Sequence, residues 1–380
     1  MNAAWPLALA CTIACTKTDT RAPPPRDEPK PVAAAAAVSL PELERARLEY
    51  LFEAAGLVAR SWPELGADQT CLLLIAQTLQ WVVNCAEAPD GFERTAEQFR
   101  GLPVFSHTGD SFETAGETRS TSELLARTPA AAHVFGSSGR KRPFPNRHPW
   151  LLLGTLEALR QFHPAFGPAT TEHWLSVAMH EFVHIHQLRQ PSFAPYAERI
   201  DARELQPAAL VALYAGDADL RAQIVREHQQ LSAAGMRARD GEAARLALSD
   251  WLRSYRKRSA RIARRPDGAQ LLHDERLFMY LEGVARFVES DFLVNPAQHP
   301  TRPLAGDPQF HGFEAFLGRG YAASPNRQLD DEYYYAIGYH LCVLLERVDP
   351  GWQRRVDIQP GWLLGVVEEL LLHRVEHARQ

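Results

Sequence analysis

The sequence has few cysteines and no marked excess of either charge. Its 380 residues include five cysteines, and 41 lysines and arginines stand against 46 aspartates and glutamates, so the formal net charge is −5. This balance gives no electrostatic argument for nucleic-acid binding. The sequence also lacks a cysteine spacing typical of a zinc finger and any glycine-rich loop of the dinucleotide-binding or Walker type. A globular protein remains, long enough for a large core and one to three domains.

Residues 1–16 contain an apolar run that is too short to span a bilayer as a stable anchor. The run ends in small residues and cysteine, as export signals do. The stretch from Leu7 to Cys11 resembles the lipobox of bacterial lipoproteins, and Ile13 to Cys15 is a weaker second candidate. An ordinary apolar N-terminus is the alternative. We expect an exported protein of the cell envelope, on the periplasmic or outer-membrane face, whose only membrane contact is an N-terminal lipid anchor.

Residues 17–40 are rich in proline, alanine and charged residues. Such a segment buries little apolar surface and is expected to be disordered or extended. We interpret it as a tether that precedes the folded part of the chain. For that folded part we expect an N-terminal lobe over residues 41–190 and a helical C-terminal lobe over residues 191–380.

Two cysteines of the folded part flank a pair of short apolar runs. Cys71 precedes the run 72–76, and Cys85 follows the run 81–83. If these runs form a hairpin that turns near Thr78, the two cysteines face each other. A disulfide is then expected in an exported protein, and two separate buried thiols are the equally weighted alternative.

The hydrophobic pattern predicts an α+β protein in which helix predominates. Apolar residues at helical spacing predict a helix over residues 40–60, and a continuous apolar run predicts a buried strand over residues 150–156. Turn-forming residues dominate residues 86–146, where we expect mainly loops. The remaining predicted elements are two strands within 72–83, a helix starting at Thr170 or Thr171, and helices over 203–213, 217–233 and 242–264.

The most specific motif is the sequence HEFVH, which contains His180, Glu181 and His184. Residues four apart lie on one face of a helix, so both imidazoles can bind one Zn²⁺ ion. Glu181 lies about 100° round the helix from His180, beside the metal rather than on it. Its carboxylate can then accept a proton from the attacking water.

Two histidines leave zinc short of a third protein ligand, which hydrolytic sites usually have. His186 is only two residues past His184 and points away from the shared face. Gln187 shares that face, but an amide is a poor zinc ligand, so we expect it to form hydrogen bonds near the site.

Glu282 is the best candidate for the third ligand. It lies in the sequence YLEGVARF, among apolar residues at helical spacing. A carboxylate in such surroundings costs several kcal/mol unless it is paired or metal-bound. Gly283 and Ala285 would allow this helix to approach another closely. A structural ion pair with Arg286 is the alternative, and we rank four other acidic residues lower because their surroundings look solvated: Glu198, Asp201, Glu204 and Asp274.

Tyr335 is a second candidate catalytic residue. It lies in the sequence YYYAIGYH, directly before an apolar helical run. A phenol beside a metal can donate a hydrogen bond to the oxyanion of a tetrahedral intermediate. Packing at the rim of the core is the alternative for this tyrosine.

Together, HEFVH, a later Glu-Gly-x-Ala segment and a Tyr-x-x-Gly segment resemble the gluzincin branch of the zincin metallopeptidases. The resemblance implies an N-terminal lobe with a small sheet and an active-site helix, and a helical C-terminal lobe. It also implies that an edge strand, here residues 150–156, binds the substrate as an added strand. The same resemblance implies three zinc ligands: His180, His184 and Glu282. It also implies that Glu181 is the general base and that Tyr335 stabilises the transition state.

One spacing departs from the best-known gluzincins. Glu282 lies 98 residues after His184 (282 − 184), where those enzymes have about one helix-turn-helix between the two ligands. The metzincin pattern is disfavoured, because Gln187 and Gln190 stand where it needs glycine and histidine.

The sequence therefore predicts a zinc-dependent hydrolase that cleaves peptide bonds in a peptide or protein substrate. A zincin-like binding protein of the envelope, without turnover, is the alternative. A purely structural zinc site would need a fourth protein ligand, and none is visible in the sequence.

Overall fold

The computed structural model describes most of the chain after the tether. The described residues are 37–62, 65, 70–89, 91–114, 117–127, 130–133, 149–193, 208–238, 240–318, 333–357 and 361–377. They form an α+β protein in which helix predominates, as predicted. The predicted export segment and all but the last four residues of the predicted tether lie outside this part of the chain. No described helix is both long enough and apolar enough to cross a bilayer.

The chain divides into two compact units. Unit 1 contains Met1–Ala59, Gly66–Ile185 and Pro300–His311, and unit 2 contains Arg60–Leu65, His186–His299 and Gly312–Gln380. We describe each unit by itself.

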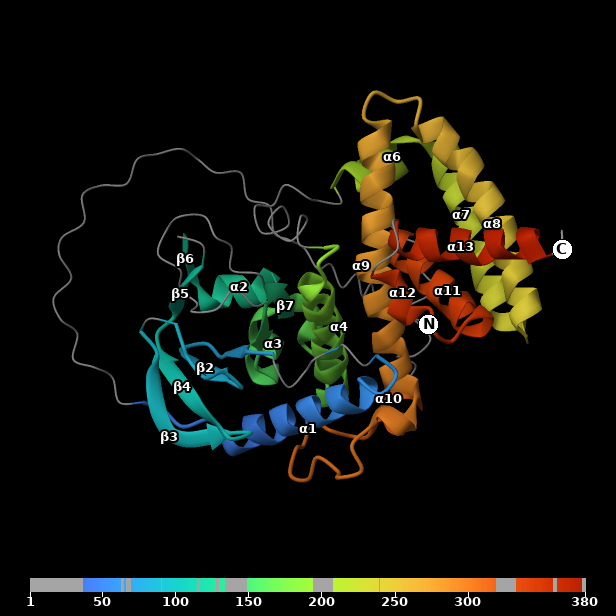
Figure 1. The fold of residues 1–380 in the computed structure, drawn as a ribbon. Coiled ribbons are helices and arrows are strands. Elements are labelled where there is room, and N and C mark those ends of the chain that lie inside the picture. The colour runs from blue at the N-terminus through green and yellow to red at the C-terminus, as the bar shows by residue number, and fades with distance from the viewer. Residues whose placement is uncertain are drawn as a thin grey trace, which may run out of the picture. The chain divides into compact units, whose positions relative to one another are not determined.

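Unit 1 contains a six-stranded mixed sheet in the order β3-β4-β2-β1-β8-β7. The pairs are antiparallel except for β1 with β8, which is parallel. A separate hairpin pairs β5 with β6. Figure 1 shows β2, β3 and β4 side by side. The bounds are β1 (Leu72–Ile75), β2 (Leu79–Val83), β3 (Glu93–Phe99), β4 (Leu102–Thr108), β5 (Ser111–Thr114), β6 (Glu117–Ser120), β7 (Ala130–His133) and β8 (Trp150–Gly154).

The prediction of loops over residues 86–146 was wrong. Strands β3 to β7 and helix α2 (Thr121–Arg127) lie in this region. β3 escaped detection because it is polar, with only Thr95 and Phe99 buried along it. β3 and β4 are joined by a tight hairpin turn. Arg100 and Gly101 both have positive φ between β3 and β4, as a two-residue type I′ turn requires.

The predicted hairpin over residues 72–83 is confirmed. β1 pairs with β2, and Leu72 lies opposite Val83. Cys71 lies one residue before Leu72 and Cys85 two residues after Val83, and they form a disulfide with their Cα atoms 5.1 Å apart. Of the two alternatives left open by the sequence, the disulfide is therefore the one formed.

The implied role of residues 150–156 as an edge strand was wrong. β8 is indeed a buried strand, but it pairs with β1 on one side and with β7 on the other. In the described part of the sheet, the outer strands are β3 and β7. Because both edges of β8 are already paired, no edge of this strand is left for an added strand.

Three acidic side chains of unit 1 contact the guanidinium of Arg47. Arg47 lies on α1 (Glu42–Val58) and is fully buried. Its guanidinium contacts Glu44 on the same helix, Glu157 on α3 (Leu156–Phe162), and Asp307, each at 2.8 Å. Burial raises the pKa of Glu44 to about 8, although Arg47 opposes this shift. Glu44 is therefore largely protonated at neutral pH.

The raised pKa makes the stability of unit 1 depend on pH. A carboxyl whose pKa is raised by folding stabilises fully below pH 4.5, and this contribution is lost as pH rises towards 8. Glu44→Gln mimics the protonated form. We expect its free energy of unfolding to match that of the wild type at pH 5 and to exceed it by roughly 3–4 kcal/mol at pH 8. Chemical denaturation at several pH values measures this difference.

The control for this prediction is Glu49→Gln on the same helix. Glu49 is 41% exposed and pairs with Arg302, so its removal should change the free energy of unfolding by no more than about 1 kcal/mol. Parallel curves for the wild type and Glu44→Gln would contradict the assignment of a raised pKa to Glu44.

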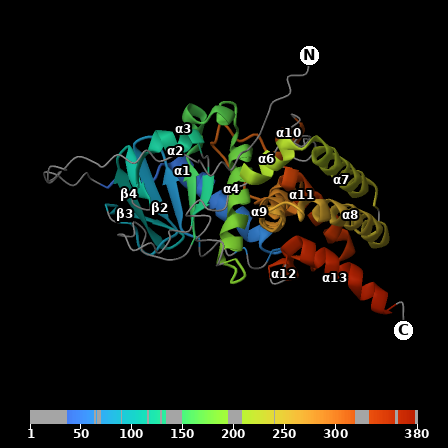
Figure 2. The same cartoon turned by 90° about the horizontal axis from the view of Figure 1, so that it is seen from above.

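Unit 2 is helical in its described residues. Figures 1 and 2 show α7 and α8 side by side, and each begins after an aspartate, Asp217 or Asp240, whose side chain caps the helix. These two helices confirm the ones predicted over residues 217–233 and 242–264. Of the helix predicted over residues 203–213, residues 203–207 lie outside the described residues. The helices are α6 (Ala208–Gly216), α7 (Ala218–Arg237), α8 (Gly241–Ile262), α9 (Gly268–Val294), α10 (Phe313–Gly318), α11 (Tyr333–Val348), α12 (Gln353–Val356) and α13 (Trp362–His377).

Helices α9 and α11 cross with their backbones in contact at two glycines. A Cβ atom on Gly283 of α9 would lie 2.4 Å from the Cα of Gly338 on α11, and one on Gly338 would lie 2.2 Å from the carbonyl oxygen of Met279. The predicted close approach at Gly283 is thus confirmed. The partner is the glycine of the Tyr-x-x-Gly segment, so two separate sequence motifs meet at one helix crossing.

We expect Gly338→Ala to destabilise the protein by about 2–3 kcal/mol, because the new methyl group must push the two helices apart. The matched control is Gly56→Ala on α1, where a Cβ would meet no atom within 4 Å. That change should stabilise by about 0.5–1 kcal/mol, since alanine favours helix. Equal effects of the two substitutions in urea denaturation would contradict the close crossing.

Candidate metal centre

The motif HEFVH lies on α4 (Thr171–Arg189), which begins where the sequence predicts. In unit 1 the first turn is held by the segment 300–311. The hydroxyl of Thr171 donates to Asp307 Oδ2 at 2.7 Å, and the carboxylate of Glu172 accepts from the backbone N–H of His311. Asp307 in turn accepts from Arg47. The start of the motif helix is therefore tied to the charged network of α1.

Residues 171–187 of α4 are buried on every side of the helix. An apolar side of the helix packs in unit 1, where the ring of Phe182 meets that of Phe52 edge-on at 5.6 Å. Buried polar side chains cost free energy unless they have partners or bind a ligand. Several of the polar residues on this helix form hydrogen bonds within the fold. The motif residues form a cluster of their own.

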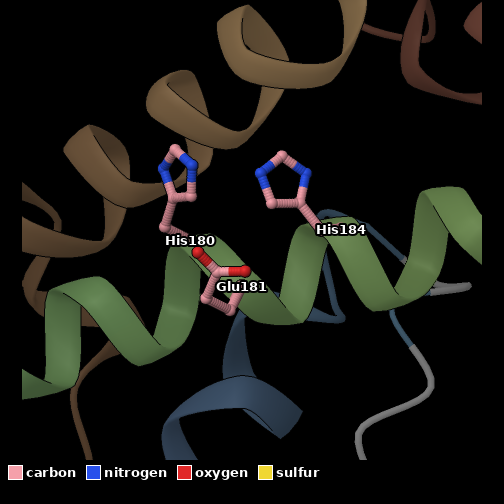
Figure 3. A group of neighbouring side chains, drawn as sticks. All are labelled: His180, Glu181 and His184. Carbon is pink, nitrogen blue, oxygen red and sulfur yellow. The ribbon is translucent and has the colours of Figure 1, made fainter. Parts of the chain in front are cut away.

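His180, Glu181 and His184 come together as one group. Each offers a ligand atom, and these three atoms lie within 4.8 Å of one another. The exposed fractions are 3%, 3% and 9%. The two imidazole rings are 4.8 Å apart and nearly perpendicular, and Figure 3 shows both on one side of the helix with Glu181 beside them. In the part of the chain that the structure describes, this is the single group of its kind.

This donor set fits zinc. Imidazole nitrogen and carboxylate oxygen are ligands that Zn²⁺ takes in proteins, with bonds of about 2.0–2.2 Å. Two imidazoles four residues apart on a buried helix lie on the same face before an ion binds, so little rearrangement is needed to bind it. The protected position also keeps bulk water from competing for the side chains.

His186 and Gln187, the next polar residues of α4, belong to unit 2. The Nε2 atom of His186 lies 3.0 Å from Asp357 Oδ2, and the amide of Gln187 donates to the carbonyl oxygens of Tyr280 and Leu281. Asp357 lies 171 residues further along the chain, and no local pattern in the sequence pointed to it. The predicted hydrogen-bonding role of Gln187 is confirmed by its bonds to α9.

Glu282 and Tyr335 lie in unit 2, on α9 and α11 respectively. Glu282 is 8% exposed and precedes Gly283 at the helix crossing. The guanidinium of Arg286 lies 5.7 Å from the ring centre of Tyr335 and also donates to Glu289 at 2.9 Å. The roles of Glu282 as third ligand and of Tyr335 as oxyanion donor stay predictions.

Of the four lower-ranked acidic residues, the structure describes one. Asp274 on α9 is buried, not solvated as the sequence suggested, and it accepts a hydrogen bond from the amide of Gln270 at 2.6 Å. Glu198, Asp201 and Glu204 lie outside the described residues.

No protein-family model matches the sequence, and neither curated proteins nor solved structures show a significant match to it.

Two histidines of α4 provide a paired test of the metal centre. We expect His184→Ala to lose bound zinc, because it removes one of two imidazoles on the shared face. His186→Ala should keep about one zinc per chain while it destabilises the protein by about 1–3 kcal/mol, since Asp357 loses a buried partner. Metal analysis after dialysis and urea denaturation measure the two effects. Zinc loss in both variants, or in neither, would contradict the assignment.

Proposed function

We propose that this protein is a zinc-dependent peptidase of the zincin type, with gluzincin-like ligands. The single observation that carries the proposal is the meeting of His180, Glu181 and His184 on one buried turn of α4. Two imidazoles for the metal and a carboxylate beside them are what metal-assisted hydrolysis of a peptide bond needs.

Glu181 has the central chemical role in this proposal. When bound, zinc would polarise the scissile carbonyl and make a water molecule more acidic. The carboxylate of Glu181 accepts the proton of the attacking water and then delivers it to the leaving amine. Its place next to His180 in the sequence puts it beside the metal ligands, and its 3% exposure shields the transferred proton from bulk solvent.

Glu282 is proposed as the third ligand and Tyr335 as the donor to the oxyanion. Two facts about unit 2 support Glu282. Its side chain is buried, and the Gln187 amide from the end of the motif helix bonds to α9 at the two residues that precede it. The crossing at Gly283 and Gly338 supports the pairing of Glu282 with Tyr335, because it brings the two helices that carry them into contact.

The disulfide supports an exported location. Cys71 and Cys85 are joined, and such bonds persist mainly in oxidising compartments. We propose a protein of the cell envelope with an N-terminal lipid anchor as its membrane attachment, acting on peptides or proteins in that compartment.

The decisive variant is Glu181→Gln. We expect it to keep zinc, because the ligands are intact, and to lose peptide hydrolysis by at least about 10²-fold, because the general base is gone. Metal analysis and a quenched-fluorescence peptide library measure the two properties. The matched control is Glu172→Gln on the same helix, which keeps an acceptor oxygen for His311 and should keep activity.

Two other results would each overturn part of the proposal. A wild-type protein that holds zinc but cleaves no peptide would favour the zincin-like binding protein. A Glu282→Ala variant that keeps full zinc affinity would remove Glu282 as third ligand and leave the two histidines in place.

A further inference from the structure

Gln187 connects the end of the motif helix to the helix that carries Glu282. It is fully buried, and it lies seven residues, or about two turns, after His180 on α4, so that it continues the stripe of His180 and His184. Its Nε2 atom donates to the carbonyl oxygens of Tyr280 at 3.1 Å and Leu281 at 3.2 Å. A helix carbonyl has a second lone pair for such a donor.

The same turn of α9 is held from a second direction. The hydroxyl of Tyr280 donates to Asp357, whose other oxygen lies 3.0 Å from His186 on α4. Trp362 stacks on the Tyr280 ring at 5.8 Å. Consecutive residues of α4 thus reach Tyr280 through its backbone and through its side chain. A helix fixed at both points can neither slide along nor rotate against the end of α4.

Glu282 follows Leu281 directly. We propose that Gln187 is a positioning residue for the third zinc ligand: its amide fixes the α9 turn of Tyr280 and Leu281 to the α4 turn after His184. The proposal rests on the proposed function, since it takes Glu282 as that ligand. The bonds to two adjacent carbonyl oxygens fix the position of α9 along the axis of α4. That position decides where the side chain of the next residue, Glu282, projects.

The test compares the zinc affinity of the full chain in four variants and the wild type. Gln187→Met keeps the length of the side chain and removes the donor. Gln223→Met is the matched control, because Gln223 on α7 also donates its amide to a helix carbonyl, that of Ser254 on α8. The others are Glu282→Ala and the double variant Gln187→Met with Glu282→Ala. Competition for Zn²⁺ with a chromophoric chelator measures each dissociation constant.

We expect Gln187→Met to raise the zinc dissociation constant about 10–100-fold, as loss of a group that orients a ligand does, and Gln223→Met to leave it unchanged. In the Glu282→Ala background, Gln187→Met should have no further effect, because the ligand it positions is already absent. Wild-type affinity in Gln187→Met, or losses that multiply in the double variant, would overturn the proposal.

The other outcomes separate this proposal from the proposed function. If the wild type binds no zinc, both are overturned. If Glu282→Ala alone weakens zinc binding and Gln187→Met does not, the third ligand stands and the positioning role is excluded.

A second variant covers the case in which Gln187→Met does not fold. Asp357→Asn keeps an acceptor for Tyr280 and removes the charge that pairs with His186. It should raise the zinc dissociation constant relative to the wild type, and only when Glu282 is present, because it loosens the same turn of α9. An effect that persists in the Glu282→Ala background would overturn the proposal.

Discussion

The burial of α4 on all sides is the constraint on which the rest of the structure depends. A helix with no solvent-facing side would ordinarily be apolar throughout, because each buried polar group needs a partner. This helix instead carries a series of polar residues over its last three turns. The fold supplies Asp357 for His186 and two carbonyl oxygens for Gln187.

Both ends of α4 are therefore held by side chains from other parts of the chain. At its start, Thr171 bonds to Asp307, which is itself bound by the buried charge of Arg47. At its end, His186 and Gln187 bond to groups that belong to, or contact, α9. A helix fixed at both ends cannot rotate about its axis. Its middle turn, which carries the motif, therefore keeps its orientation. Such rigidity is what a preformed metal site requires.

The sequence predicted the parts of this protein whose signal is local. The spacing of HEFVH predicted two imidazoles on one face of a helix. Gly283 predicted a close approach to another helix, because glycine has no side chain to keep the helices apart. Strand β3 was missed because its residues are mostly polar and only Thr95 and Phe99 are buried, so no apolar run marks it. The place of β8 inside the sheet was missed for another reason: pairing order is decided by segments far apart in the chain, here by β7. Asp307 bonds to Thr171, 136 residues away, and Asp357 to His186, 171 residues away, and no pattern near either aspartate predicts these contacts.

The division into two units has a consequence for the order in which this protein can be completed during synthesis. The chain passes from one unit to the other after residues 59, 65, 185, 299 and 311, so neither unit is a continuous piece of sequence. Arg47 emerges from the ribosome 260 residues before Asp307, the partner of its guanidinium. Before Asp307 is made, Arg47 has Glu44 and Glu157 as partners but lacks the third carboxylate of its buried network. The network around Arg47 can therefore be completed only after most of unit 2 has been translated.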